Sequence, residues 1–348
     1  MLVYIAIFVF LLIVSLGSNK WKWLFLFVFV FLVLFAGFRN DNVGVDTYEY
    51  RLFFNFLSRG YYISWLEPGW VILNIVISKI GGNFLELLTI VSFLTLLPVF
   101  YVVKKNSPYI FFSLFVFYGL HIYCGAFNLM RQYLAISITF LAYFLFERGK
   151  QKTALLTWLF ACSFHYSCIL AVIVFFFNKV HTKIDIKYFL VLIFCAFAFG
   201  SIVNRQIIDI VTFSEYTAVA KQRENVVVAG LLTIAVDIFM LTIAYTSKPK
   251  LLNSFWGRLF VLSIVVFNAT YTLYLSARIY SLFAISQVIF LPLYIKYSTI
   301  KNKLIPILFV GLYVSVQFWR MYLTNGNNIL PYQINVFDLK LSIFRFFV

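Results

Sequence analysis

Residues 21–50 read WKWLFLFVFVFLVLFAGFRNDNVGVDTYEY. An unbroken apolar run, Trp21–Phe38, leads directly into the densest polar stretch of the chain, Arg39–Tyr50. An apolar run of about 20 residues is long enough to cross the hydrocarbon core of a bilayer as one helix. This stretch therefore predicts a membrane-spanning helix with a polar loop at its end.

The rest of the 348-residue chain has the same character: 63% of it is hydrophobic, 21% aromatic and 11% charged. Soluble domains are about 45–50% apolar and about 25% charged, so this composition excludes an ordinary soluble protein. We expect an all-α integral membrane protein with about ten full transmembrane helices. Their expected ranges are 1–16, 21–38, 84–103, 109–124, 127–146, 187–203, 226–245, 255–275, 279–297 and 304–323.

Two further apolar runs are too short or too broken to cross. Residues 69–80 would span only about 18 Å as a helix, and residues 153–177 are interrupted by the polar sequence SFHYS at 163–167. We expect both to be half-membrane elements that line a cavity. The chain is expected to form one polytopic domain, 1–348. Three of its segments are expected on the outer side of the membrane: a loop with an interfacial helix at 39–69, a loop at 204–225 and a tail at 324–348.

The basic residues indicate the orientation of the chain. With ten crossings, 16 of the 28 Lys and Arg residues fall on one side, which should be the cytoplasm, and 14 of these are Lys. Of the 12 on the other side, nine are Arg. A planar guanidinium group suits phosphate oxygens held at close quarters, so the outward face is expected to hold an anion. The net charge of +16 then reports topology and gives no argument for nucleic acid as a partner.

Two carboxylates of the outer loop, Asp46 and Glu67, have a structural and a catalytic interpretation. Asp46 followed by Glu49 forms a capping box, and Pro68 after Glu67 is a favoured first helical residue. On that interpretation an amphipathic helix lies in the interface, with one apolar face made of Tyr50, Phe53, Phe54 and Leu57. The alternative is that the carboxylates take part in a reaction, and the sequence leaves both open.

Arg131 and Arg278 each open a predicted span at its outer end. A cation at a helix N-terminus opposes the macrodipole by roughly 0.3–1 kcal/mol. Either these side chains snorkel to the interface, or both arginines and the helix N-termini bind one phosphate group. A single polar helix face is also predicted near Arg278, made of Asn268, Tyr271, Tyr274 and Arg278.

Two more ionisable residues lie within apolar sequence. His165 stands where 153–177 is interrupted, and it is a hydrogen-bonded structural group, a general base or a diphosphate contact. Asp237 lies near the middle of the span at 226–245, where an ionised group costs about 2.5–3.5 kcal/mol. It serves either helix packing or a site.

Several familiar chemistries have no motif here. The chain contains neither phosphate-binding glycine loop, neither G-x-x-x-x-G-K-[ST] nor G-x-G-x-x-G. No D-x-D pair or His/Cys cluster suggests a metal site, and the four cysteines lie in apolar stretches as expected of buried, inert thiols. We expect no metal and no cofactor.

The outer motifs together resemble the EpsG-like polysaccharide polymerase family, which includes many Wzy-type O-antigen polymerases. The resemblance is specific from about residue 36 to residue 167 and looser beyond, where it rests on Arg278 and Pro331-Tyr332. The matching motifs are Ala36-Gly37-Phe38-Arg39, Val43-Gly44-Val45-Asp46-Thr47, Tyr50, Phe54, Glu67-Pro68-Gly69, Arg131-Gln132 with Ala135, and Phe164-His165 with Ser167.

This resemblance implies a GT-C-like polytopic glycosyltransferase of the bacterial inner membrane with an active site facing the periplasm. Its partners would be the lipid bilayer, undecaprenyl-diphosphate-linked oligosaccharides and a chain-length regulator. Asp46 is the favoured base, with Glu67 and His165 as the other candidates. The diphosphate would bind Arg39, Arg131 and Arg278, and the substrate would contact Tyr50, Gln132, Asn268, Tyr271, Tyr274 and Tyr332.

Two rival functions use similar parts. A lipid-linked oligosaccharide flippase would also contain broken helices and cavity arginines, but an internal repeat is expected of a transporter and none is evident. An O-antigen ligase would use the same donor with a different acceptor, and only the motif set argues against it.

Overall fold

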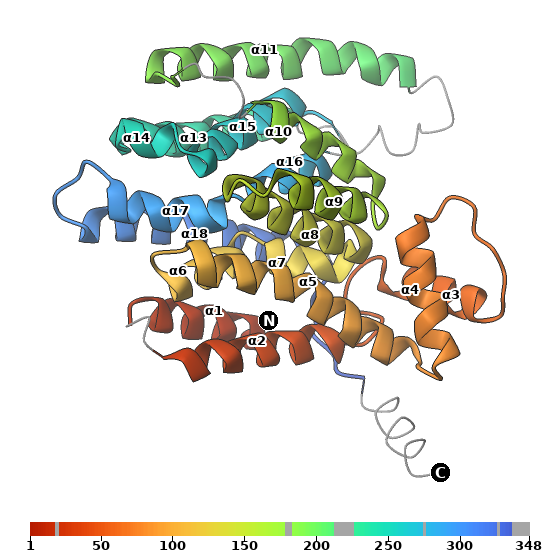
Figure 1. Cartoon of the computed structure of the whole chain (residues 1–348). Coiled ribbons are helices and arrows are strands. Elements are labelled where there is room, and N and C mark those ends of the chain that lie inside the picture. Colours follow the sequence, from red (N-terminus) through yellow and green to blue (C-terminus); the bar gives the residue numbers. More distant parts are fainter. Residues whose placement is uncertain (18–20, 178–182, 212–225, 274–275, 326–327, 336–348) are drawn as a thin grey trace. The chain divides into compact units, whose positions relative to one another are not determined.

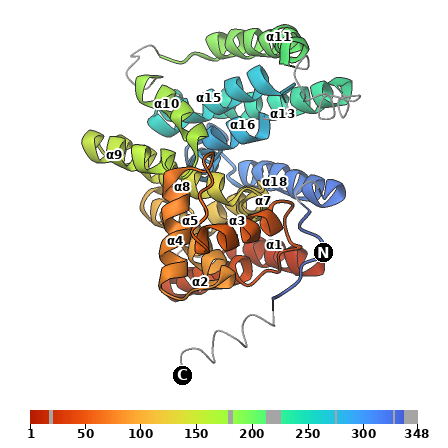
Figure 2. The ribbon, with the colours of Figure 1, turned by 90° about the vertical axis from the view of Figure 1, so that its right-hand side faces the viewer.

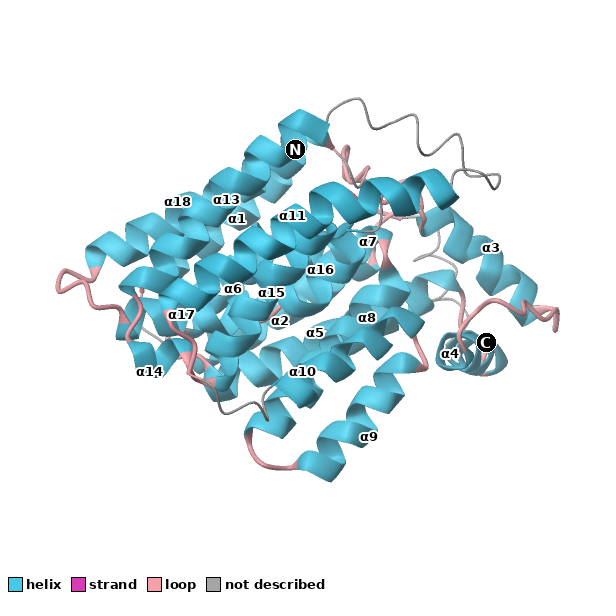
Figure 3. Ribbon diagram, turned by 90° about the horizontal axis from the view of Figure 1, so that it is seen from above, coloured by secondary structure: helices cyan, strands magenta, loops and turns pink. Residues whose placement is uncertain are grey.

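A computed structural model describes the chain except for residues 18–20, 178–182, 212–225, 274–275, 326–327 and 336–348. The described residues form helices and loops without a strand, as Figure 3 shows. They group into two compact units, Met1–Ile169 with the chain from Val314 onward, and Leu170–Tyr313. The all-α prediction is confirmed.

The first unit is a bundle whose N-terminal helices pack on helices far along the chain, α1 on α6 and α2 on α5 (Figure 1). The central helix α8 packs between α5 and α9. Its helices are α1 (Leu2–Ser15), α2 (Lys22–Gly37), α3 (Thr47–Ser58), α4 (Pro68–Lys79), α5 (Phe84–Asn106), α6 (Ile110–Gly119), α7 (Ile122–Asn128), α8 (Met130–Glu147) and α9 (Gln151–Cys162).

In the second unit α15 packs against α11, α13, α14, α16 and α17, and Figure 2 shows α11 beside this group. Two elements, η1 and α18, cross from one unit to the other along the chain. The remaining elements are η1 (Tyr166–Ala171), α10 (Val172–Phe177), α11 (Ile186–Val211), α13 (Val226–Thr246), α14 (Pro249–Leu252), α15 (Phe255–Thr270), α16 (Ser276–Ala284), α17 (Gln287–Tyr297) and α18 (Leu304–Thr324).

The apolar helices fit a membrane-embedded protein, but ten full crossings stay a prediction. Within the described residues, α5 and α18 are each long and apolar enough to cross a membrane. The number rises to four if two bent pairs, α6 with α7 and α16 with α17, are each counted as one span. The expected loop at 204–225 begins as helix, because α11 continues to Val211, and 212–225 lies outside the described residues.

Two expected continuous spans are broken, and the breaks have visible causes. The run at 109–124 bends by 44° between α6 and α7, where His121 adopts a left-handed conformation with φ of 66°. The run at 279–297 bends by 42° around Ile285 and Ser286. Gly125 lies within α7, where a Cβ atom would collide with the ring of Tyr133.

The two half-membrane elements have the expected lengths and break. Helix α4 has 12 residues, and α9 ends at Cys162 directly before the polar interruption. The amphipathic helix is α3, whose buried face contains Tyr50, Phe54 and Leu57. This face joins α4, α5 and Met130 in one core cluster. The cysteine prediction is only partly right, because Cys124 and Cys168 are buried whereas Cys195 is exposed.

Candidate functional site

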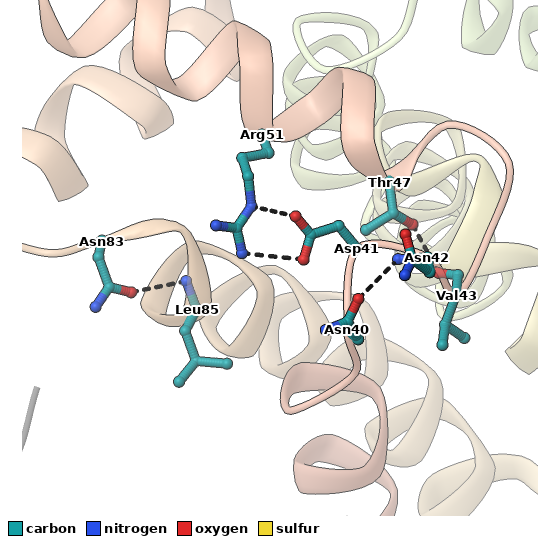
Figure 4. A network of polar contacts seen from close by, with 8 residues as sticks. All are labelled: Asn40, Asp41, Asn42, Val43, Thr47, Arg51, Asn83 and Leu85. Atoms are coloured by element: carbon teal, nitrogen blue, oxygen red, sulfur yellow. Dashed lines mark hydrogen bonds and ion pairs between the residues drawn. The ribbon is translucent and has the colours of Figure 1, made fainter. Parts of the chain in front are cut away.

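The motif loop, residues 38–47, connects α2 to α3 and is fixed by its own polar side chains (Figure 4). Arg51 of α3 binds the carboxylate of Asp41 with two groups, Nε at 2.5 Å and Nη2 at 3.0 Å. The hydroxyl of Thr47 donates to the carbonyl oxygen of Val43 at 2.8 Å. These contacts give the loop one conformation before any substrate is considered.

The same loop is joined to the end of α7. The carbonyl oxygen of Phe127 accepts from Arg39 Nη2 at 3.3 Å and from Thr47 Oγ1 at 3.0 Å. The backbone N–H of Asp46 donates to Asn128 Oδ1 at 3.0 Å. Gly44 has φ of +101°, and a Cβ atom there would lie 2.5 Å from the Phe127 oxygen, so only glycine fits this approach. The motif loop is thus positioned relative to the start of α8.

Residues 328–335 of the tail hold the loop from the opposite end of the chain. Asn40 N–H donates to the oxygen of Gln333 at 2.8 Å, and Gly44 N–H donates to that of Asn328 at 2.9 Å. The ring of Tyr332 stacks on Phe35 with centroids 4.1 Å apart. Its hydroxyl donates to the Phe35 carbonyl at 2.7 Å. These contacts give Tyr332, a predicted substrate contact, a structural role.

Glu67 is the centre of the site. It stands immediately before α4, with Pro68 as the first helical residue, and its side chain is 3% exposed. Its carboxylate makes no capping bond within the described chain. Instead, one oxygen accepts from Arg131 Nη1 and the other lies 2.7 Å from His165 Nδ1. The structure thus brings together three residues that the sequence singled out separately.

His165 reaches Glu67 because the start of α4 meets the end of α9. The N–H of Gly69 donates to the carbonyl oxygen of Ser163 at 2.8 Å. A Cβ atom at Gly69 would lie 2.8 Å from that same oxygen and closer still to Ser163 Oγ. Real Cβ atoms do not approach so closely. The glycine at this position therefore sets the distance between Glu67 and His165.

Arg131 lies at the start of α8, and its guanidinium group is flanked by aromatic rings. Its carbon Cζ is 5.3 Å from the ring centre of Trp65 and 5.9 Å from that of Tyr50. Such contacts contribute about 0.5–2 kcal/mol when partly desolvated. Tyr50 is buried and was predicted to bind substrate, but here it packs against Arg131 and Trp70. Gln132, next to Arg131, is also buried.

The charge of Glu67 is stabilised by its partners. Burial alone would raise the pKa of the Glu67 carboxyl, but the hydrogen bond with His165 and the positive charge of Arg131 outweigh it. The net result is a pKa below the ordinary value. Glu67 is therefore ionised at neutral pH.

Arg39 lies elsewhere in the unit and is 1% exposed. Its guanidinium donates to the carbonyl oxygens of Ala36 and Phe127, and the ring of Phe127 lies 4.9 Å from Cζ. Its Nε has no hydrogen-bond partner among the described residues. Burial lowers the pKa of Arg39 to about 10, so it stays charged at pH 7.

A small pocket of about 20 Å³ adjoins Arg39. Ser92, Thr95 and Met130 are among the residues of its largely apolar lining. The pocket thus combines a buried cation with apolar surface.

Asp46, the favoured base, is half-buried at the N-cap of α3. Its position agrees with the capping interpretation, but its side chain makes no capping hydrogen bond in the described structure. The capping box predicted with Glu49 is therefore wrong in its contacts. The reason is that Asn128 binds the Asp46 N–H, and α3 is held by tertiary contacts instead.

The predicted polar face near Arg278 does not lie on one helix. Helix α15 ends at Thr270, so Tyr271 is its C-cap residue, and Arg278 belongs to the separate helix α16. Tyr274 lies outside the described residues. Asn268 donates to Asp237 Oδ1 at 2.8 Å, and the Tyr271 hydroxyl lies 2.7 Å from Ser201 Oγ. In the described structure Asn268 and Tyr271 therefore each have a hydrogen-bond partner within the second unit.

The sequence interpretation missed Trp65 and Asn128. Trp65 lies two residues before Glu67, so a search for aromatic residues beside the candidate carboxylates finds it. Nothing in the sequence pairs Asn128 with the backbone of Asp46. Among the described residues, no group of three His, Cys, Asp or Glu side chains gathers to hold a metal ion.

Residues 22–334 of the chain match the family model of the EpsG family. The chain belongs to the EpsG family. No curated protein and no solved structure matches it. The match covers the motif loop, Glu67, Arg131, His165 and Arg278, and membership supports a polysaccharide polymerase-like role for this membrane-embedded EpsG family protein.

Proposed function

We propose that this EpsG family protein is a surface-polysaccharide polymerase of the bacterial inner membrane. It transfers a growing glycan from undecaprenyl diphosphate onto a lipid-linked repeat unit at the periplasmic face. Family membership supports the polymerase class. One observation supports the chemistry above all others: the buried Glu67 carboxylate is shared between Arg131 and His165.

This arrangement favours His165 as the general base. Glu67 is ionised and can only accept, so Nδ1 of His165 carries the proton that it donates, and Nε2 is the basic nitrogen. The His165 side chain is partly exposed, whereas Glu67 is buried. We therefore assign the base to His165 and its orientation to Glu67, ahead of Asp46.

The proposed step is a simple glycosyl transfer. An acceptor hydroxyl oxygen attacks the donor's anomeric carbon and loses its proton to His165 Nε2. The bond from that carbon to the phosphate oxygen breaks, and undecaprenyl diphosphate leaves with the electron pair. A general base contributes about 10²–10⁴-fold to such a rate.

The negative charge on the leaving group requires cations, and two described arginines are suited to this role. Arg131 uses Nη1 for Glu67, and its buried Nε has no hydrogen-bond partner among the described residues. Arg39 is a buried cation without a carboxylate partner among the described residues, and it adjoins a pocket with largely apolar walls. We propose that both contact the lipid diphosphate and that a chain-length regulator acts as a further partner. Arg278 lies in the second unit, and its role at the diphosphate stays a prediction from the sequence.

A deletion strain distinguishes this proposal from its rivals. A polymerase defect leaves single repeat units on the surface acceptor, whereas loss of a flippase or a ligase leaves no glycan there. Full-length glycan in the deletion strain would contradict the proposed function.

Complementation of that strain tests the base. His165→Gln should reduce glycan synthesis by about 10²–10⁴-fold with normal membrane insertion, whereas Asp46→Asn should stay within about tenfold of the wild type. The reverse result would return the role to Asp46.

A further inference from the structure

The loop between α3 and α4 exposes three aromatic rings close to the site. Tyr61 and Tyr62 lie in its first half, and Trp65 lies two residues before Glu67. Tyr62 is 79% exposed and Trp65 is 57% exposed. Large apolar side chains that remain this open in a loop next to a buried ion network need a physical reason.

Tyr61 meets the ring of Phe56 edge to face, whereas Trp65 contacts both a ring and a charged group. On one side the guanidinium group of Arg131 lies 5.3 Å from its ring centre. Phe53 of α3 meets it edge to face, with centroids 5.1 Å apart and an interplanar angle of 81°. The ring is therefore fixed by two contacts and still leaves more than half of its surface uncovered.

We propose that Trp65 is the platform on which one sugar ring of the glycan substrate stacks. A pyranose ring has an apolar C–H surface surrounded by hydroxyl groups. A rigid indole matches the apolar C–H surface at a low cost in conformational entropy. The nearby Arg131 and His165 match the hydroxyl groups. This inference rests on the proposed function, since it places the sugar beside the base.

The competing occupant is the bilayer surface, where Trp and Tyr side chains form interfacial belts. An interfacial anchor needs no fixed orientation against a charged group. Trp65, in contrast, is oriented by Arg131, which is in turn bound to the buried Glu67. Its position thus follows the ion network, which favours a substrate over lipid.

The test measures glycan binding to the full-length protein in nanodiscs. The probe is the oligosaccharide repeat unit released by mild acid from the host's own surface polysaccharide, titrated calorimetrically. Trp65→Ala should weaken binding about tenfold, Trp65→Phe should stay within about threefold, and Tyr62→Ala, the exposed control from the same loop, should bind like the wild type. If Trp65→Ala does not reconstitute, Trp65→Leu keeps the bulk without the aromatic face and replaces it.

Three results would overturn the inference: no binding by the wild type, unchanged binding by both Trp65→Ala and Trp65→Leu, or equal losses in Trp65→Ala and Tyr62→Ala, as expected of interfacial anchors. Failure of the proposed function is seen separately, because it appears as full-length glycan in the deletion strain whatever the binding data show.

Discussion

Glu67 explains why a cation is tolerated at the first turn of α8. Arg131 there opposes the helix macrodipole by roughly 0.3–1 kcal/mol, and the carboxylate of Glu67 next to it compensates. A buried carboxylate is in turn costly unless it is paired and hydrogen-bonded. Arg131 and His165 provide the ion pair and the hydrogen bond that the buried Glu67 carboxylate needs. Glu67 in turn offsets the unfavourable position of Arg131 at the helix N-terminus.

The first prediction concerns the pH dependence of this cluster. Because folding lowers the pKa of Glu67, its charge stabilises the folded state above the ordinary carboxyl pKa of about 4.3. That contribution is lost as the pH falls through the lower folded value. Glu67→Gln leaves Arg131 without its carboxylate and should cost about 3 kcal/mol of stability at neutral pH.

Thermal unfolding in nanodiscs measures this. The gap in unfolding temperature between the wild type and Glu67→Gln should be wide at about pH 7 and close as the pH falls below about 4. Glu49→Gln, at an exposed position of α3, should change stability by less than about 0.5 kcal/mol throughout. A gap that stays constant down to the acid limit would show that the charge of Glu67 does not stabilise the fold.

The second prediction concerns the type of cation at residue 131. Arg131→Lys keeps the positive charge near Glu67 but loses the planar fork that also faces Trp65 and Tyr50. We expect glycan synthesis to fall at least about tenfold in the complemented deletion strain, whereas Arg59→Lys, an exposed control, should have no effect. Full-length glycan from a normally inserted Arg131→Lys protein would remove Arg131 from the diphosphate site.

Much of this cluster was predictable as a set of residues but not as a set of contacts. Glu67, Arg131 and His165 each stand out because an ionisable group interrupts apolar sequence or begins a helix. Their shared carboxylate depends on how α4, α8 and α9 pack, which no local pattern contains. For the same reason the capping interpretation of Asp46 placed the residue correctly and its hydrogen bond wrongly.

Among the elements, the junction of α4 with the end of α9 is the most sensitive. Two helices that the sequence marked as short bring Glu67 and His165 together through one backbone hydrogen bond, from Gly69 to Ser163. The third prediction is that Gly69→Ala pushes these ends apart, since its Cβ would collide with Ser163. A misplacement of about 1 Å costs roughly 10²-fold in rate.

The measurement is glycan length in the complemented deletion strain, alongside protein yield in the membrane. Gly311→Ala is the matched control, because a Cβ atom at that position meets nothing within 4 Å. We expect it to elongate glycan normally. If Gly69→Ala does the same, the spacing of Glu67 and His165 is unimportant for the reaction.

Long apolar runs predicted where most helices occur, because a chain inside a bilayer satisfies its backbone hydrogen bonds by forming helices. It did not predict the breaks at His121 and at Ile285–Ser286. Both lie within apolar runs, so nothing in their composition marks them, and the left-handed backbone of His121 is visible only in the fold. The break at 163–165 was predictable because polar residues interrupt the run there.

At the scale of the whole molecule, the distribution of basic residues is the main argument for orientation. The side expected to face the cytoplasm has 14 of its 16 cations as Lys, and the other side has nine of its 12 as Arg. Hydrated lysines suffice as topological anchors, while guanidinium groups suit phosphate. Arg39, Arg131 and the motif loop all belong to the Arg-rich set, so the direction in which they face decides which substrates reach them.

The last prediction tests this orientation directly. In a variant whose four cysteines are replaced by alanine, a cysteine at Asn42 should react with a membrane-impermeant thiol reagent added to the periplasmic side, and a cysteine at Asn302 should react only after the membrane is permeabilised. Both positions are exposed, so accessibility within the fold does not decide the result. The native cysteines must be removed because Cys195 is itself exposed. Asn327, the other outer position expected from the sequence, lies outside the described residues and serves as a second outer probe. Labelling of Asn302 with protection of Asn42 would place the Glu67–Arg131–His165 cluster on the cytoplasmic side, where a polymerase acting on translocated lipid-linked repeat units cannot use it.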